Sequence, residues 1–450
     1  MKNFLQGKFF RLVWTAGLAL LIYWLCPRCF SKNSLMAVLV TLLVILNIFP
    51  FLNNAKGGVK TIFFWFTQLV RIFVGGLFIF SGFIKSNDPL GFSYKLEEYF
   101  EVFKADTGLG LFEWFAHISL PLAIIICVSE VALGIMLLLG FKRNLTLWLL
   151  FAQIAFFTFL TFYSACYNKV THCGCFGDFL KLTPWESFWK DLILLIAISI
   201  LFVGKDSINE LFSPLISNVL TVIAVIASIW FPIHAYRNLP MMDFRAYAPG
   251  LSICEGLKPG PNFKPAVYES RFIYKNIQTG DTTEFTDKNY PWQDTLHWKY
   301  HRALGSVVVS PAVDEAKITD FTISDLDGNV VTDSILGIKD YNFYLICYDL
   351  SKTEQDAKLM AQINDFYTLC QKEKINFIAI TSSSSDQISE FKHKHNALYD
   401  FYTMDGIVLK TMIRSNPGLM LMKDCKVIKN WHHNNWPVYS DVKNNFMIQK

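Results

Sequence analysis

Two cysteines separated by one glycine, Cys173 and Cys175, have the types and spacing that most directly indicate chemistry in this sequence. A disulfide between them closes a small, strained ring, and strained, exposed disulfides exchange easily with other thiols. His172 precedes the pair, and a nearby imidazolium lowers the pKa of a thiol and so favours the reactive thiolate. The motif therefore indicates thiol–disulfide exchange.

A second pair, Cys26 and Cys29, has the Cys-x-x-Cys spacing. This spacing occurs in exposed redox pairs, and it forms half of a zinc site when a second knuckle follows at the right distance. The sequence has no such second knuckle, so we expect no metal and interpret the pair as redox-active, with Arg28 lowering the pKa of the attacking thiol. The alternative is that both cysteines are structural or incidental residues at a helix end.

Apolar runs place both pairs at a membrane. Of the 450 residues, 52% are hydrophobic and 17% are charged, so part of the chain must lie in lipid, and the net charge of +4 is too small to indicate nucleic acid. Seven runs approach the length that crosses a bilayer: 9–25, 35–52, 62–84, 118–139, 145–165, 188–203 and 215–233. Cys26 and Cys29 lie between the first two runs, and Cys173 and Cys175 lie between the fifth and the sixth.

Basic residues in short loops set the expected orientation. The loops 53–61, 141–144 and 204–212 contain lysine or arginine, and short basic loops favour the cytoplasmic side. With an odd number of spans, both cysteine pairs and everything after Tyr236 then lie outside. We therefore expect a multi-pass protein of the cytoplasmic (inner) membrane with a periplasmic C-terminal domain.

The residues around Cys173 resemble a known family. The stretch 173–177, Cys-Gly-Cys-Phe-Gly, followed by Trp185 and by Asp191 at the head of a helix, resembles the signature of the methylamine-utilisation MauE branch of the DoxX superfamily. The earlier run 71–89 resembles the first helix of that four-helix unit, and the two signals together cover about residues 61–205. The resemblance implies a membrane protein linked to thiol and disulfide handling outside the cytoplasm.

Few ionisable residues lie within the apolar runs. Glu130 lies near the middle of the fourth run, and Arg71 and Lys85 lie near opposite ends of the third. An uncompensated carboxylate in lipid is costly, so we expect Glu130 to be neutral, paired or facing a polar cavity. Two interpretations stay open: a polar cluster that fixes helix packing, or a proton or quinone site. A quinone is therefore possible, and no cofactor is certain.

The composition changes after residue 240. Five prolines mark a linker, and alternating short runs predict a small β-rich insert before residue 315. From residue 316 strands and helices alternate, in an order that resembles a thioredoxin-like domain of the membrane-tethered thiol-reductase or peroxiredoxin-like kind. Pro417 takes the place of the cis-proline of that family. In that family, the active-site Cys-x-x-Cys directly follows the central strand. The residues at this position here, Cys347 to Thr353, contain no such pair. We therefore expect a domain that has the fold but no dithiol chemistry.

The sequence thus predicts a multi-pass α-helical membrane domain of about seven spans, with a DoxX-like four-helix unit plus extra helices, followed by a soluble α/β thioredoxin-like domain. The expected parts are an N-terminal two-helix hairpin at 1–60, a MauE/DoxX-like membrane domain at 61–212, a last membrane helix at 213–240, a linker and β-rich insert at 241–315, and the thioredoxin-like domain at 316–440.

Two functions fit this organisation. In a redox relay, Cys173 and Cys175 exchange with Cys26 and Cys29 or with a partner protein, and so support disulfide handling of extracytoplasmic proteins. In a non-enzymatic membrane scaffold, the thioredoxin-like domain docks a client protein. The expected partners are the lipid bilayer and an extracytoplasmic thiol or client protein, without nucleic acid.

Overall fold

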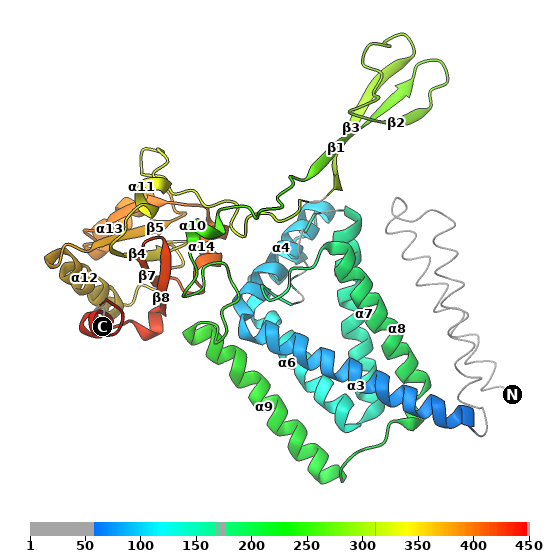
Figure 1. The fold of residues 1–450 in the computed structure, drawn as a ribbon. Helices are drawn as coiled ribbons and strands as arrows, with labels where there is room; N and C mark the ends of the chain where they lie inside the picture. Colours follow the sequence, from blue (N-terminus) through cyan, green and yellow to red (C-terminus); the bar gives the residue numbers. More distant parts are fainter. Residues whose placement is uncertain (1–57, 168, 171–173, 175, 311, 448–450) are drawn as a thin grey trace. The chain divides into compact units, whose positions relative to one another are not determined.

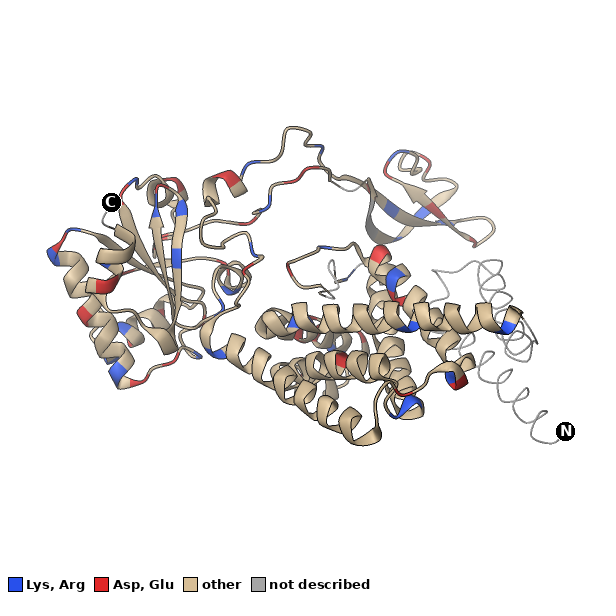
Figure 2. Ribbon diagram, turned by 60° about the horizontal axis from the view of Figure 1, so that its bottom comes forward, with Lys and Arg blue, Asp and Glu red and all other residues tan. Residues whose placement is uncertain are grey.

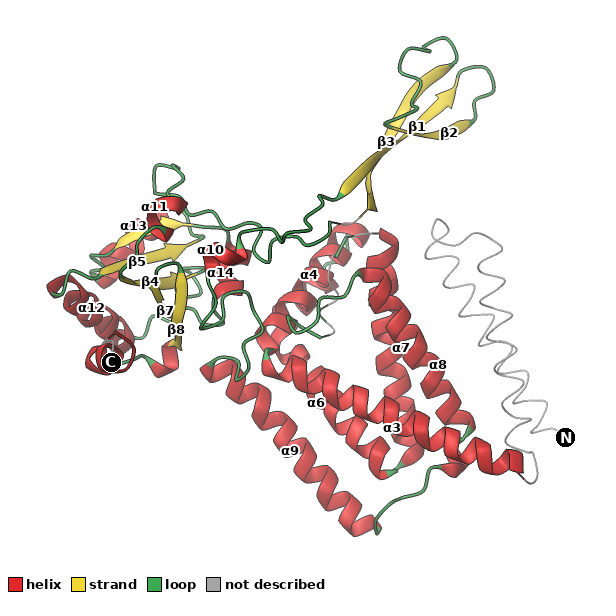
Figure 3. Cartoon of the chain, in the orientation of Figure 1, coloured by secondary structure: helices red, strands yellow, loops and turns green. Residues whose placement is uncertain are grey.

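The computed structural model describes residues 58–167, 169–170, 174, 176–310 and 312–447. The predicted hairpin at 1–60 lies almost wholly outside these residues, together with Cys26, Arg28 and Cys29; His172, Cys173 and Cys175 lie outside them as well. The chain divides into two compact units, with the boundary between Arg245 and Ala246. Helices make up the described part of the first unit, and all the strands belong to the second (Figure 3).

The first unit consists of helices that follow one another closely along the chain (Figure 1). They are α3 (Gly58–Asn87), α4 (Pro89–Thr107), α5 (Leu111–His117), α6 (Ser119–Leu139), α7 (Arg143–Tyr167), α8 (Pro184–Val203), a short 3₁₀ turn (Lys205–Ser207) and α9 (Pro214–Asn238). Local signals explain several boundaries. Asp88 caps α4 and Thr183 caps α8, each just before a proline at the first helical position. Gly140 ends α6 in the left-handed conformation.

Glycines allow α3 and α6 to pack closely. A Cβ atom added at Gly82 would lie 2.7 Å from a methyl carbon of Val131, and one at Gly134 would lie 2.8 Å from the carbonyl oxygen of Gly75. Small residues at such crossings let helix backbones approach each other in a membrane. This contact sets the position of the C-terminal half of α3, which carries Lys85, against α6.

Four of the described helices are long and apolar enough to cross a membrane: α3, α6, α7 and α9. Lys, Arg, Asp and Glu are sparse along them (Figure 2). The predicted sixth run, 188–203, forms most of α8, but α8 is not among the four because Glu186, Lys190 and Asp191 occupy its first two turns. The chain is a multi-pass membrane protein in contact with the bilayer, and a total of seven spans stays a prediction.

The second unit contains a small sheet at the place where the sequence predicts a β-rich insert. Its strands are β1 (Val267–Asn276), β2 (Thr282–Thr286) and β3 (Trp298–Ser310), in the antiparallel order β2-β1-β3. Aromatic rings pack across the strands, including Tyr274 against Phe285 and Phe285 against Trp298. Cross-strand aromatic pairs of this kind stabilise a sheet that has few other contacts.

The larger sheet of the second unit is mixed and has five strands. They are β4 (Tyr341–Cys347), β5 (Asn376–Thr381), β6 (Asp400–Thr403), β7 (Gly418–Lys423) and β8 (Lys426–His432), in the order β6-β5-β4-β7-β8. The strands β6, β5 and β4 run parallel, and β7 and β8 are antiparallel to their neighbours. The helices are α10 (Ile253–Gly256), α11 (Thr332–Leu336), α12 (Ala357–Lys372), α13 (Ser385–His395), α14 (Gly406–Met412) and α15 (Tyr439–Val442). This arrangement agrees with the expected thioredoxin-like domain.

Part of the predicted linker belongs to the fold of the second unit. Residues 247–253 run along the free edge of β8: Gly250 N donates to the Val427 carbonyl at 2.7 Å, and Val427 N donates to the Leu251 carbonyl at 2.9 Å. A disulfide between Cys254 and Cys425 then closes this edge, with 5.8 Å between the Cα atoms. The two cysteines are 171 residues apart, so no local sequence pattern pairs them.

Candidate functional site

A buried ion pair joins two of the candidate residues, Lys85 of α3 and Glu130 of α6. The Lys85 Nζ lies 2.6 Å from Glu130 Oε1 and 2.8 Å from Oε2, and it also donates to the Ser81 hydroxyl at 2.8 Å. The two charged side chains are 2% and 4% exposed. Glu130 is therefore paired, which is one of the three states that its position in an apolar run predicts.

Aromatic rings and hydrogen bonds complete the surroundings of the Lys85 ammonium. Its Nζ lies 5.0 Å from the ring centroid of Phe157 and 5.4 Å from that of Phe92. An ammonium over a ring face is attracted by the negative face of the ring, most strongly away from water. The pair is thus shielded from bulk water, and each charge depends on the other for compensation.

A second ion pair lies at the start of α8. Asp191 is 1% exposed, accepts a hydrogen bond from the Thr161 hydroxyl at 3.1 Å and lies 2.6 Å from Lys190 Nζ. Lys190 Nζ also lies 5.2 Å from the ring centroid of Phe176. Sequence reasoning noted Asp191 only through the family signature and missed Lys190 and Thr161 as site residues. The available signal was a pair of charges at the head of an otherwise apolar helix.

Both ion pairs line one small cavity inside the membrane unit. Its lining comprises Leu77, Phe78, Ser81, Lys85, Glu130, Ile154, Phe157, Phe176, Lys190, Asp191 and Leu194, and its volume is ≈ 20 Å³. A space of this size, with charged groups in its lining, holds about one water molecule. It does not fit the ring of a quinone.

The loop that contains the cysteine pair borders this cavity through its described residues. Phe176, which follows Cys175, is 7% exposed, lines the cavity and packs on Phe80 with 5.9 Å between ring centroids. Gly174, which separates the two cysteines, has a φ of 71°, and a Cβ there would lie 3.0 Å from Lys95 Cγ. Both the left-handed backbone and the close approach of Lys95 require glycine at this position.

Arg71 lies at the other end of α3 and does not join this cluster. Its Nε donates to the Leu137 carbonyl at 2.8 Å, and its Nη2 donates to the Leu138 carbonyl at 2.7 Å. These carbonyls belong to the last turn of α6, where backbone acceptors lack helical partners. Arg71 therefore caps a helix end.

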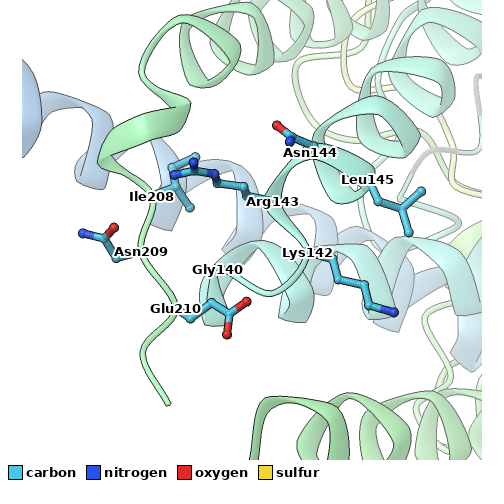
Figure 4. A pocket seen from close by; sticks show the side chains of 8 residues that line it. All are labelled: Gly140, Lys142, Arg143, Asn144, Leu145, Ile208, Asn209 and Glu210. Atoms are coloured by element: carbon cyan, nitrogen blue, oxygen red, sulfur yellow. The ribbon is translucent and has the colours of Figure 1, made fainter. Parts of the chain in front are cut away.

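A larger hollow lies at the turn between α6 and α7 (Figure 4). Gly140, Lys142, Arg143, Asn144, Leu145, Ile208, Asn209 and Glu210 line it, and its volume is ≈ 520 Å³. Arg143 is already paired with Asp206 at 3.2 Å and donates to the Lys205 carbonyl at 3.1 Å. The hollow is open and contains no thiol, so we place the candidate site at the cluster around Lys85.

In the thioredoxin-like domain, residues 347–353 form the loop at the position of the family's redox motif, and side-chain hydrogen bonds hold this loop in place. Cys347 ends β4 and is 1% exposed, and burial raises the pKa of its thiol to about 12. The side chain of Asn416 ties this loop down, since its Nδ2 donates to the Asp349 carbonyl at 2.9 Å and its Oδ1 accepts from Thr353 at 2.9 Å. The next peptide bond, Asn416–Pro417, is cis, as expected at this position.

We therefore expect the second unit alone, residues 246–450, to have no catalytic disulfide-reductase activity. The reactive species in disulfide exchange is a thiolate, and the pKa of Cys347 keeps this thiol protonated near neutral pH. The check is reduction of a model disulfide by the isolated segment, with Cys347→Ala as the matched control. Turnover that depends on Cys347 would contradict this expectation.

The fold and the site together define a multi-pass membrane protein joined to a thioredoxin-like domain. Residues 63–204 match the family described as "Methylamine utilisation protein MauE", and residues 268–304 match a "Domain of unknown function (DUF8463)". The first match confirms the predicted resemblance of this part of the chain to the MauE family. The matched stretch contains Lys85, Glu130 and Asp191.

Three known proteins are similar to parts of the chain. "Protein TlpB" of Flavobacterium psychrophilum is 27% identical over 146 residues, which are 31% of this chain and 37% of TlpB. The chain thus matches little more than a third of that relative's length. A putative protein disulfide isomerase from Bacteroides thetaiotaomicron covers 26% of this chain and 77% of its own, at 21% identity and a TM-score of 0.23. Yeast Sco1 covers 28% and 90%, at 15% identity and a TM-score of 0.23.

Proposed function

We propose that this protein is a membrane thiol–disulfide relay that supports disulfide handling of extracytoplasmic proteins. The observation that carries the proposal is the buried cluster of two ion pairs beneath Phe176, the residue that follows Cys175. Buried ion pairs beside a pair of cysteines make this cluster a candidate functional site. The MauE match and the similarity to TlpB support the same general role.

In the proposed reaction, a partner thiolate attacks the disulfide between Cys173 and Cys175. A mixed disulfide forms with one cysteine, and the other leaves as a thiolate. A second thiolate of the partner then breaks the mixed disulfide, so that two electrons pass from the partner dithiol to the pair. The ammonium groups of Lys190 and Lys85 lie at the cavity below the loop and stabilise the negative charge of the leaving thiolate.

The acceptor of the two electrons is proposed to be a second disulfide, that of Cys26 and Cys29 or of another protein. Both members of this pair lie outside the described residues, so their approach to Cys173 stays a prediction. A quinone is a further possible acceptor in the proposal. It would bind away from the cavity between Lys85 and Asp191, which has room for about one water molecule.

The proposal places the second unit outside the cytoplasm, on the periplasmic side of the inner membrane. The Cys254–Cys425 disulfide supports this orientation, because disulfides persist in oxidising compartments and are rare in the cytosol. The basic short loops of the membrane part favour the same orientation.

Trapping of a mixed disulfide tests the relay. With Cys175→Ser, the Cys173 thiolate can attack the disulfide of the oxidised partner, which is the reverse of the proposed step and releases one partner thiolate. Cys173 has no resolving neighbour, so we expect a mixed disulfide with a partner protein that disappears on reduction. Cys166→Ser is the matched control, since Cys166 is a half-buried cysteine of α7 and this variant should give no adduct.

In intact spheroplasts that contain the wild-type protein, a membrane-impermeant thiol reagent should label reduced Cys175. For the trapping experiment, absence of an adduct in both Cys175→Ser and Cys173→Ser would refute the relay.

The scaffold function remains a second candidate, and a specific observation favours it. Within the described residues, the thioredoxin-like domain holds its free cysteines, Cys347 and Cys370, buried, and it uses Cys425 in a disulfide with Cys254. Such a domain is suited to docking a client and not to exchanging electrons. A pair at Cys173 and Cys175 that stays oxidised in cells under every growth condition would favour the scaffold.

A further inference from the structure

The segment 239–245 connects the last membrane helix to the second unit, and it folds back onto the membrane unit. Asn87, the last residue of α3, is 1% exposed and binds this segment with both ends of its amide. Its Nδ2 donates to the Met242 carbonyl at 2.6 Å, and its Oδ1 accepts from Met242 N at 3.0 Å. The start of the segment is also held in an unusual conformation: Leu239 has a φ of 115°, which a branched side chain keeps only where its surroundings hold it.

A series of aromatic rings continues from this segment to the loop of the cysteine pair. The ring centroid of Phe244 lies 5.1 Å from that of Phe179, which lies 5.7 Å from that of Phe80. Phe80 in turn lies 5.9 Å from Phe176, whose ring accepts the Lys190 ammonium. The rings therefore connect the segment 239–245 to the buried cluster through direct contacts.

We propose that Asn87 and Phe244 are positioning residues: through the segment 239–245 they hold residues 176–180 over the cluster of Lys85, Glu130, Lys190 and Asp191. This inference depends on the relay proposed above, in which the cysteine pair next to residues 176–180 exchanges disulfides.

Hydrogen exchange of the full-length protein in lipid nanodiscs tests the contact. The loop has two turn hydrogen bonds, from Gly177 N to the Gly174 carbonyl and from Phe179 N to the Phe176 carbonyl, both 3.1 Å long. Phe244→Ala should accelerate exchange of these two amides roughly two- to tenfold, the range for loss of one aromatic pair. Phe244→Tyr keeps the ring and should restore protection. Met241→Ala, at an exposed residue of the same segment, is the matched control.

A second readout separates positioning from a merely structural role. In a fixed thiol–disulfide buffer, Phe244→Ala should change the ratio of oxidised to reduced Cys173–Cys175 pair, and Phe244→Tyr should restore the wild-type ratio. Asn87→Asp, which keeps one of the two hydrogen bonds to Met242, should change the amide exchange and the ratio in the same direction.

Unchanged amide exchange in Phe244→Ala would overturn the inference, and so would faster exchange with an unchanged redox ratio. Failure of the mixed-disulfide trap is a separate result, because it removes the relay without altering amide exchange. The two failures are therefore distinguishable.

Discussion

Replacing Glu130 by alanine should destabilise the membrane unit by about 3–5 kcal/mol, because it leaves the Lys85 ammonium buried without a counter-charge. The side chain of Lys85 is 2% exposed and cannot reach water from its place between α3 and α6. The measurement is unfolding of the detergent-solubilised protein, followed by the loss of helical signal. Glu113→Ala is the matched control: it breaks an ion pair with Lys104 whose side chains are 56% and 47% exposed, so its effect should be much smaller.

A double variant separates the two interpretations of this pair. Lys85→Met together with Glu130→Leu removes both charges and keeps apolar volume, and such replacements are often neutral or stabilising. We expect the double variant to recover stability, but its combination with Cys175→Ser should not form the mixed disulfide. If both were recovered, the pair would serve packing alone. If Glu130→Ala proved as stable as the wild type, the pair would not be shielded from bulk water.

Loss of the Cys254–Cys425 disulfide should lower the stability of the second unit by about 2–4 kcal/mol, since the bond closes a long stretch of chain and so restricts the unfolded state. Cys254→Ser with Cys425→Ser is the variant, and urea unfolding of the full-length protein, followed by a probe in the second unit, is the measurement. The segment 247–253 should also become more sensitive to proteases, because it loses its covalent link to the end of β7–β8 and keeps only its hydrogen bonds and packing contacts.

The wild-type protein in the presence of a reductant is the natural control for this variant. Both should show the same midpoint, and the reductant should leave the midpoint of the double variant unchanged. Equal stability of the oxidised wild type and the variant would mean that the disulfide does not form in the membrane-bound protein. The main support for a periplasmic second unit would then be lost.

The sequence by itself determined the elements and their local boundaries. Apolar runs located α3, α6, α7 and α9, because a helix in lipid must be apolar over its whole length. Capping residues such as Asp88 and Thr183, each followed by proline, mark helix starts through contacts within one turn. The alternation of strands and helices after residue 316 and the place of Pro417 likewise depend on neighbours in the chain.

Only the tertiary structure decided which distant residues meet. Lys85 and Glu130 are 45 residues apart, and both were candidates without being recognised as partners. The helix α6 is apolar on every side, so its sequence periodicity does not reveal the face that meets α3. The 171-residue separation of Cys254 and Cys425 hid their pairing in the same way. Such contacts follow from how whole helices and strands pack, and no local pattern encodes that packing.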